Sequence, residues 1–95
     1  MTDPQEGESL DVRRRRLRFR SHHRGTLEAD LLMGAFAEAH LAGFTSEQLD
    51  RYEVLLDAND SDLLAWVFGR KEVPPEHDHY VTSLLIQFEF RPKTS

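Results

Sequence analysis

The fold is decided at a corner formed by residues 23–30, which read His-Arg-Gly-Thr-Leu-Glu-Ala-Asp. An arginine-rich stretch precedes this corner, and an apolar run with helical spacing follows it. A glycine here can end one helix and let the chain turn into the next, because it tolerates backbone conformations that other residues avoid. Arg24 and Glu28 are then predicted to lie close together at the joint and to point outward. A guanidinium fork and a carboxylate on a rigid corner form a docking surface, but they are not a catalytic site by themselves.

The chain is short and lacks cysteine. Its 95 residues make one small domain, and the absence of cysteine excludes disulfides, thiolate zinc sites and cysteine nucleophiles. No apolar run approaches the roughly 20 residues that span a bilayer, and the N-terminus lacks the apolar core of a secretory signal. We therefore expect a cytoplasmic bacterial protein that does not insert into a membrane. The mitochondrial matrix is the less favoured location.

The net charge of −5 is unevenly distributed along the chain. Residues 1–10 carry three acids and no base, residues 11–28 carry seven arginines against two acids, and residues 29–95 carry five bases against twelve acids. The arginine run could follow a phosphate backbone, dock onto an acidic protein, or form a helix face that balances an acidic domain. No zinc finger, glycine-rich KH loop or RNP motif is present, and an acidic body repels phosphates, so nucleic acid is the less favoured partner.

Hydrophobic spacing predicts five helices between two tails. Residues 1–10 are expected to form a disordered tail and residues 92–95 a second, short tail, which leaves a single helical domain at 11–91. Helices are expected at 11–23, at 27–41, from a cap at Thr45 to about Leu56, from Asn59 or Asp60 to Gly69, and from Pro75 onward. A strand over residues 86–90, where polar and apolar residues alternate, is a weaker alternative. The predicted fold class is an all-α five-helix bundle.

The third helix has the clearest start signal in the sequence. Thr45 can serve as the N-cap, and Gln48 then falls at the third helical position, which completes a capping box. Phe44 and Leu49 occupy the two positions of a hydrophobic staple. At the start of the fifth helix, Pro75 suits the first helical position.

Four aromatic side chains are the candidates for the core. Trp66, the one tryptophan of the chain, belongs to the fourth predicted helix and is expected to pack into the core. Phe19, Phe36 and Phe88 are likewise expected to be buried.

Candidate catalytic and metal-binding patterns are weak. His77-Asp78-His79 resembles a metal-ligand cluster, but residues two apart in a helix point about 200° from each other, and no pair of histidines has the i, i+4 spacing of zinc-binding helices. Asp57, Asp60 and Asp62 are interpreted as helix caps and loop residues. No glycine-rich phosphate loop and no Ser-His-Asp set can be identified. We therefore expect neither a metal site nor an enzyme.

The order of these features resembles one family, the succinate dehydrogenase assembly factors that promote covalent flavin attachment. The resemblance extends from about Arg13 to Phe88. The residues that carry it are Arg-Leu-Arg-Phe-Arg-Ser at 16–21, the stretch 23–32, Gly34, Phe36, Ala37, His40, the stretch 49–53, Leu55, Leu56, Asp60, Asp62, Leu63 and Trp66. One position departs from the family, because relatives often have a tryptophan where this chain has His22. If that aromatic packs against the second helix, the corner here is looser; if it contacts the partner, affinity is reduced.

The resemblance implies a five-helix bundle with a chaperone-like role. Its client would be the flavoprotein subunit of succinate dehydrogenase, with that of fumarate reductase as a further candidate. A histidine of the client bonds to the flavin, so the factor supplies no nucleophile and binds no cofactor stably; FAD is acted on in the client. The complex would be transient, and the free protein would be a monomer. Partner contacts are expected from Arg20, His23, Arg24, Gly25, Glu28 and Asp30.

Two other functions stay open at this point. One is an antitoxin-like regulatory interaction protein, because some relatives have been described in toxin–antitoxin terms. The other is a small nucleic-acid-binding module that uses the basic patch. The motif itself also has a plainer interpretation, in which Glu28 suits a helix N-terminus and Arg24 is one more base.

Overall fold

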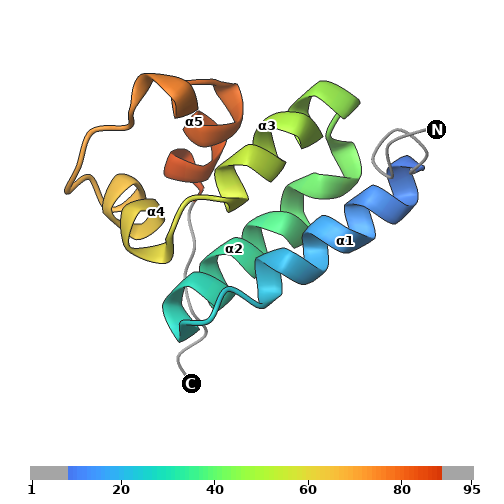
Figure 1. Ribbon diagram of the computed structural model, residues 1–95, viewed down its shortest axis with the longest axis horizontal. Helices are drawn as coiled ribbons and strands as arrows, with labels where there is room; N and C mark the ends of the chain where they lie inside the picture. The colour runs from blue at the N-terminus through green and yellow to red at the C-terminus, as the bar shows by residue number, and fades with distance from the viewer. Residues whose placement is uncertain (1–8, 89–95) are drawn as a thin grey trace.

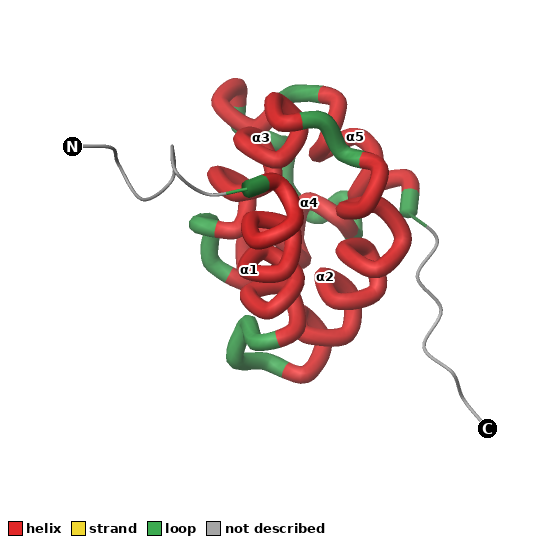
Figure 2. Tube along the Cα trace, turned by 90° about the vertical axis from the view of Figure 1, so that its right-hand side faces the viewer, coloured by secondary structure: helices red, strands yellow, loops and turns green. Residues whose placement is uncertain are grey.

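The computed structural model describes residues 9–88, which form five α-helices and two 3-10 turns without a strand (Figure 1). Figures 1 and 2 show α1 and α2 running side by side as a pair, with α3 packed against them and α4 and α5 at one end. The predicted all-α fold class is confirmed. The elements are α1 Leu10–His22, α2 Leu27–His40, η1 Leu41–Gly43, α3 Ser46–Leu56, α4 Asp60–Val67, η2 Pro75–His77 and α5 Tyr80–Gln87.

Side-chain caps start four of the α-helices formed by residues 9–88, namely α1, α3, α4 and α5. Ser9 accepts a hydrogen bond of 3.1 Å from a backbone N–H of the first turn of α1. Thr45 and Gln48 form both bonds of the predicted capping box, at 3.2 and 2.8 Å. Asn59 caps α4 with a bond of 2.8 Å. Each cap satisfies a backbone donor that a helix start leaves without a partner.

The expected tails lie largely outside the described part of the chain. Residues 1–8 and 92–95 are not described, so those two expectations stay predictions. Ser9 and Leu10 correct the boundary of the first tail, since one caps α1 and the other begins it. The alternative of a strand at 86–90 is wrong for residues 86 and 87, which are helical, and residues 89 and 90 lie outside the described residues.

An aromatic cluster occupies the centre of the core. The ring of Phe36 lies 5.6 Å from that of Tyr52 and 5.6 Å from that of Phe88, measured between centroids. Burial is confirmed for Phe36 and for Trp66, while Phe88 is half-buried. The buried apolar residues are Leu17, Ala29, Leu32, Met33, Phe36, Ala37, Leu41, Phe44, Leu49, Tyr52, Leu55, Leu56, Leu63, Trp66, Val81 and Leu85.

Phe19 is a correction, because its side chain is 64% exposed. The inward face of α1 is set by Leu17 and Ser21, which are fully buried and lie one helical turn apart. Phe19 is two residues from each of them, which places it on the opposite side of the helix. The arginines on α1 obscure this stripe in the sequence.

The start of the fifth helix is a second correction. Pro75 opens the short turn η2, and α5 begins only at Tyr80. The turn carries His77, whose buried ring lies 5.2 Å from that of Trp66. Beyond it the backbone leaves helical geometry at Asp78 (φ −83°, ψ 78°), so a new cap is needed, and His79 accepts from the backbone of the first turn of α5.

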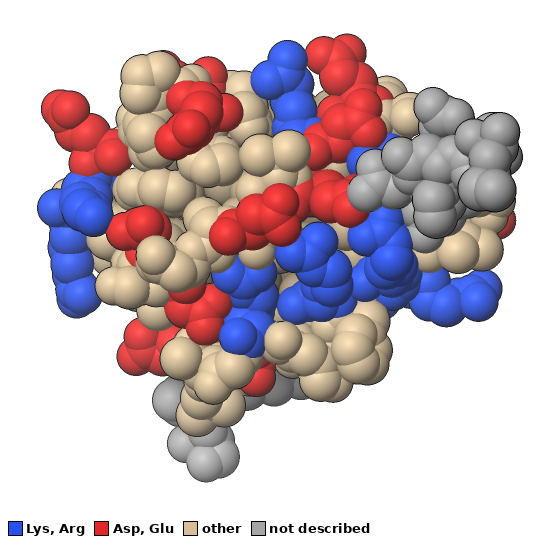
Figure 3. Space-filling view, in the orientation of Figure 1, with Lys and Arg blue, Asp and Glu red and all other residues tan. Residues whose placement is uncertain are grey.

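Ion pairs fasten α1 to α3. Arg13 and Arg16 both reach the carboxylate of Glu53 at 3.0 Å, and Arg20 pairs with Asp57 at 2.9 Å. Figure 3 shows the resulting arrangement, in which a row of basic side chains lies beside a row of acidic ones. Further contacts join Arg14 to the carbonyls of Leu41 and Phe44 and Arg18 to Glu38. Of the three interpretations of the arginine run, this geometry favours a helix face that balances an acidic domain.

None of the helices formed by residues 9–88 is both long and apolar enough to cross a bilayer.

Candidate functional site

Arg24 points into the molecule. Its side chain is 9% exposed, and its Nε lies 2.9 Å from a carboxylate oxygen of Asp60. Its two terminal nitrogens donate to the carbonyls of Leu56 and Ala58, at the end of α3, where a helix leaves carbonyls without partners. The prediction that Arg24 points outward is therefore wrong. Its acceptors come from a loop more than thirty residues further along the chain, which local sequence does not reveal.

Two aspartates hold the corner from either side. The carboxylate of Asp30 accepts from the backbone N–H groups of Arg24 and Gly25, the latter at 3.1 Å. The second carboxylate oxygen of Asp60 accepts from the hydroxyl of Thr26 at 3.1 Å. Sequence reasoning treated Asp60 as a cap and missed this role, although Asp60 is among the residues that carry the family resemblance. Together these bonds fix the α1–α2 loop against the α3–α4 loop.

Gly25 forms the exposed point of the corner. Its φ of +115° is a conformation that side-chain-bearing residues rarely adopt, while the space where a Cβ would lie contains no atom within 4 Å. The backbone conformation, rather than close packing, thus requires a glycine. The predicted sharp turn is confirmed.

Glu28 is the outward-facing member of the motif. It lies in the first turn of α2, where a negative charge suits the helix dipole. Its side chain is exposed and makes no hydrogen bond or ion pair with any of residues 9–88. Arg24 and Glu28 therefore do not form a paired surface: the first is used inside the protein and the second is available to a partner.

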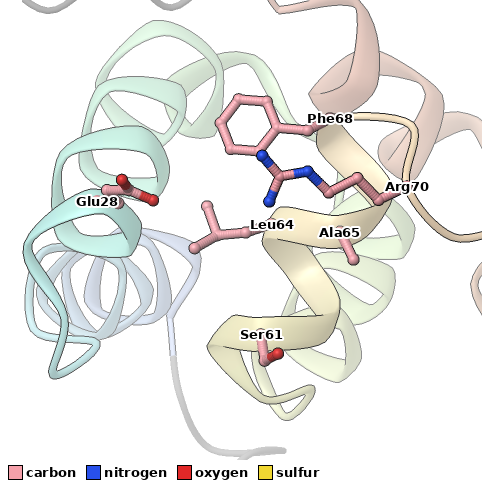
Figure 4. Close-up of a pocket in the computed structure, with 6 residues that line it drawn as sticks. All are labelled: Glu28, Ser61, Leu64, Ala65, Phe68 and Arg70. Carbon is pink, nitrogen blue, oxygen red and sulfur yellow. The ribbon is translucent and has the colours of Figure 1, made fainter.

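A shallow, open groove of about 510 Å³ adjoins Glu28. Figure 4 shows Glu28 of α2 on one side, Phe68 and Arg70 after α4 on the other, and Leu64 between them. The guanidinium of Arg70 lies 5.5 Å from the centroid of the Phe68 ring, a cation–π distance. The lining residues are Glu28, Ser61, Leu64, Ala65, Phe68 and Arg70.

The other two predicted partner residues are Arg20, in the last turn of α1, and His23, the C-cap of that helix. The ring of His23 stacks on that of Phe19, with centroids 4.0 Å apart, and its Nδ1 donates to the Phe19 carbonyl at 2.7 Å. Arg20 forms the ion pair with Asp57. The structure thus brings His23 and Gly25 to the surface, holds Arg24 and Asp30 inside the corner, and gives Arg20 a partner of its own.

His22 packs against the second helix. Its ring covers Gly34, where an added Cβ would lie only 2.4 Å from the His22 Nδ1, and its Nε2 lies 3.1 Å from a carboxylate oxygen of Glu38. The side chain at this position was expected either to pack against the second helix or to contact the partner, and the structure shows that it packs against the second helix.

A buried hydroxyl pair joins α1 to α3 within the core. The hydroxyl of Tyr52 lies 2.6 Å from that of Ser21, which in turn donates to the Leu17 carbonyl at 2.7 Å. Burial raises the pKa of Tyr52 to about 12, against the smaller opposing effects of the Ser21 hydroxyl and the nearby guanidiniums. This tyrosine is therefore neutral at physiological pH and has a structural role.

Among residues 9–88, no three histidine or acidic side chains come close enough together to hold a metal ion. His77 and His79 do approach each other, with ring centroids 6.4 Å apart, but one is buried beside Trp66 and the other caps α5.

Comparison with known proteins identifies the family. The model of a family described as flavinator of succinate dehydrogenase matches residues 15–89, which include the whole corner and groove. The chain belongs to this family. A member from Debaryomyces hansenii, named succinate dehydrogenase assembly factor 2, mitochondrial, is 43% identical over 81 residues, which are 85% of this chain and 57% of that protein.

Bacterial and animal members of the flavinator family match as well. FAD assembly factor SdhE of Acetobacter pasteurianus is 46% identical over 69 residues, covering 73% of this chain and 63% of the relative. Succinate dehydrogenase assembly factor 2-B of Drosophila simulans is 39% identical over 80 residues, covering 82% and 51%. The chain thus spans roughly half to two thirds of the length of these relatives. The resemblance inferred from sequence is confirmed.

Proposed function

We propose that this chain is an assembly factor that binds the flavoprotein subunit of succinate dehydrogenase and promotes covalent attachment of FAD to it. The flavoprotein subunit of fumarate reductase is a further candidate client. Membership of the flavinator family supports the proposal, as do the names of its relatives. We place the reaction in a bacterial cytoplasm, because one relative comes from the bacterium Acetobacter pasteurianus; the fungal and insect relatives are named as mitochondrial.

The observation that carries the proposal is the exposed, unpaired carboxylate of Glu28 on a corner held rigid from within. Because the backbone of the corner is already ordered, little backbone freedom is lost when a partner binds, so more of the contact energy is retained. Gly25 lets a partner backbone approach closely, because it presents no side chain. Both residues are expected to contact the client directly.

Arg24 and Asp30 act differently in this proposal. Their hydrogen bonds are directed to the loop itself and to the start of α4, so they position Glu28 and Gly25 instead of touching the client. Contacts from His23 and Arg20 stay predictions. His23 is already exposed, while Arg20 would have to exchange Asp57 for a client carboxylate.

The proposed mechanism requires no reacting atom from this chain. A client that exists in several conformations is shifted toward the one that the factor binds best. If that conformation places the client's histidine against the flavin, bond formation gains from proximity. FAD is the client's reactant here, and no step is assigned to it on this chain. Exposed charges raise the rate of association more than the affinity, which suits the transient complex that an assembly step requires.

Nucleic-acid binding is less well supported than client binding. Most of the guanidiniums that would follow a phosphate backbone are engaged by acids of the same chain, including Glu53, Asp57 and Glu38. Binding of arbitrary nucleic acid that falls steeply with salt would nevertheless revive that alternative.

The test is covalent flavin on the client, measured by in-gel flavin fluorescence in a strain that lacks this gene and carries plasmid-borne variants. Wild type is expected to restore the signal, whereas Glu28→Ala and Gly25→Ala are expected to restore little of it. The matched controls are Glu47→Ala, an exposed acid on α3, and Gly43→Ala, where a Cβ meets nothing within 4 Å and φ is not positive. A full signal with both motif variants at wild-type protein levels would refute the proposed site.

A further inference from the structure

The groove between α2 and α4 carries opposite charges on its two walls. Glu28 stands on the α2 side and Arg70 on the α4 side (Figure 4), and neither side chain has a hydrogen bond or ion pair among residues 9–88. Most arginines of α1, by contrast, pair with acids of the same chain. Two unpaired opposite charges facing one hollow thus mark a surface that is complementary to a dipolar partner segment.

Apolar side chains line the groove between these two charges. Leu64 lies between the two charges, and the Phe68 ring, 57% exposed, stands beneath the guanidinium of Arg70. An exposed aromatic ring under a cation offers a large contact area at a low cost in conformational freedom. Such rings are frequent anchors of protein interfaces.

We propose that this groove binds an extended segment of the client flavoprotein in which a basic residue, an apolar residue and an acidic residue follow one another. The basic side chain pairs with Glu28, the apolar one covers Leu64 and Phe68, and the acidic one pairs with Arg70. This inference rests on the proposed function and adds the second wall of the docking site. The groove continues directly from the motif corner, because Glu28 belongs to both.

The dimensions suit such a segment. From Ser61 to Phe68 the helix axis rises about 10 Å, which an extended chain covers with about three residues. A flavin dinucleotide fits less well, because Glu28 would repel its phosphates and the groove is open. A second copy of this chain is the remaining occupant, and the experiment below distinguishes it from the client.

The test places a photo-crosslinking phenylalanine analogue at position 68 in the full chain, with the same substitution at Tyr80 as the control. Tyr80 is 61% exposed, close to the 57% of Phe68, and the hollows beside it share no lining residue with the groove. After irradiation with purified client flavoprotein, position 68 is expected to give a client adduct and position 80 none. Mass spectrometry should locate the adduct in a client segment with a basic and an acidic residue flanking an apolar one.

A charge variant provides an independent measurement. Arg70→Glu is expected to raise the dissociation constant for the client about tenfold, whereas Arg51→Glu on the exposed face of α3 should change it less than twofold. Three results would refute the proposal that the groove binds the client: an adduct with a second copy of this chain, an adduct only from position 80, or unchanged affinity for Arg70→Glu. If wild type still binds the client and restores flavinylation in those cases, the proposed function stands; if wild type does not bind, both fall.

Discussion

Replacing Arg24 should destabilise the folded corner and should not remove a direct contact with the partner. The guanidinium makes three hydrogen bonds, to Asp60, Leu56 and Ala58, from a side chain that is 9% exposed. Hydrogen bonds that involve a charged group contribute roughly 1.5–3 kcal/mol each when buried. Because the carbonyl acceptors lie at a helix end that water can reach after truncation, we take about 1 kcal/mol for each bond. Arg24→Ala should therefore lower the free energy of unfolding by about 3 kcal/mol.

The assay is urea denaturation followed by circular dichroism, together with thermal melting. For a domain of this size about 3 kcal/mol corresponds to a fall in melting temperature of about 12–24 °C. Arg24→Lys keeps the charge but replaces a three-way fork by a single ammonium, so it should recover only part of the loss. Glu28→Ala, whose side chain has no partner within residues 9–88, should stay within about 1 kcal/mol of wild type.

The contrast between Arg24→Ala and Glu28→Ala tests whether Arg24 stabilises the fold while Glu28 contacts the client. If Arg24→Ala melts with wild-type behaviour while client flavinylation is lost, the arginine acts outside the fold and the positioning role is refuted. If flavinylation by Arg24→Ala recovers at a temperature where the variant is folded, the role as a positioning residue is supported, because the groups that touch the client are intact.

Three further results are expected. The hydrogen bonds of Arg16 and then Arg13 lower the pKa of Glu53 below its ordinary value of 4.5, against the opposing effect of burial. The stability that Glu53 contributes is therefore present above about pH 4.5 and lost as the pH falls through the lowered pKa, so urea titrations of Glu53→Gln should show a shallower loss of stability in acid than wild type. Gly34→Ala should stabilise a His22→Ala background by about 1 kcal/mol through helix propensity but give less in wild type, where the His22 ring must leave Glu38; equal gains in both backgrounds would contradict the packing. Trp66→Ala should cost about 3–5 kcal/mol, and a wild-type denaturation midpoint would show that Trp66 is not part of the core.

Local chemistry made the start of α3 and the corner predictable. The capping box at Thr45 and Gln48 depends on residues three apart, and the turn at Gly25 depends on a single backbone conformation. In both cases the deciding groups lie within one turn of each other along the chain. The sequence therefore contained all the information that those predictions used.

The direction of Arg24 could not be predicted in the same way. Its acceptors include the carbonyls of Leu56 and Ala58, which every residue possesses and which leave no mark in a sequence. The exposure of Phe19 depends on which side of α1 faces α2, and seven arginines between residues 13 and 24 conceal that choice. Pro75 opens η2 instead of α5, and the packing of the buried His77 against Trp66 at this turn is a tertiary contact that local sequence does not reveal.

The two charged residues of the motif therefore have separate tasks that follow from their hydrogen bonds. A guanidinium, whose three nitrogens all donate, suits a place where two loops converge and several carbonyls need partners. A carboxylate in the first turn of a helix needs no internal partner, because the helix dipole already stabilises it. Glu28 can thus remain exposed and unpaired at little cost in stability, and Arg24 cannot. Any substitution that keeps the hydrogen bonds of Arg24 should leave Glu28 and Gly25 correctly placed. Differences in client affinity among such variants therefore measure direct contacts with the client.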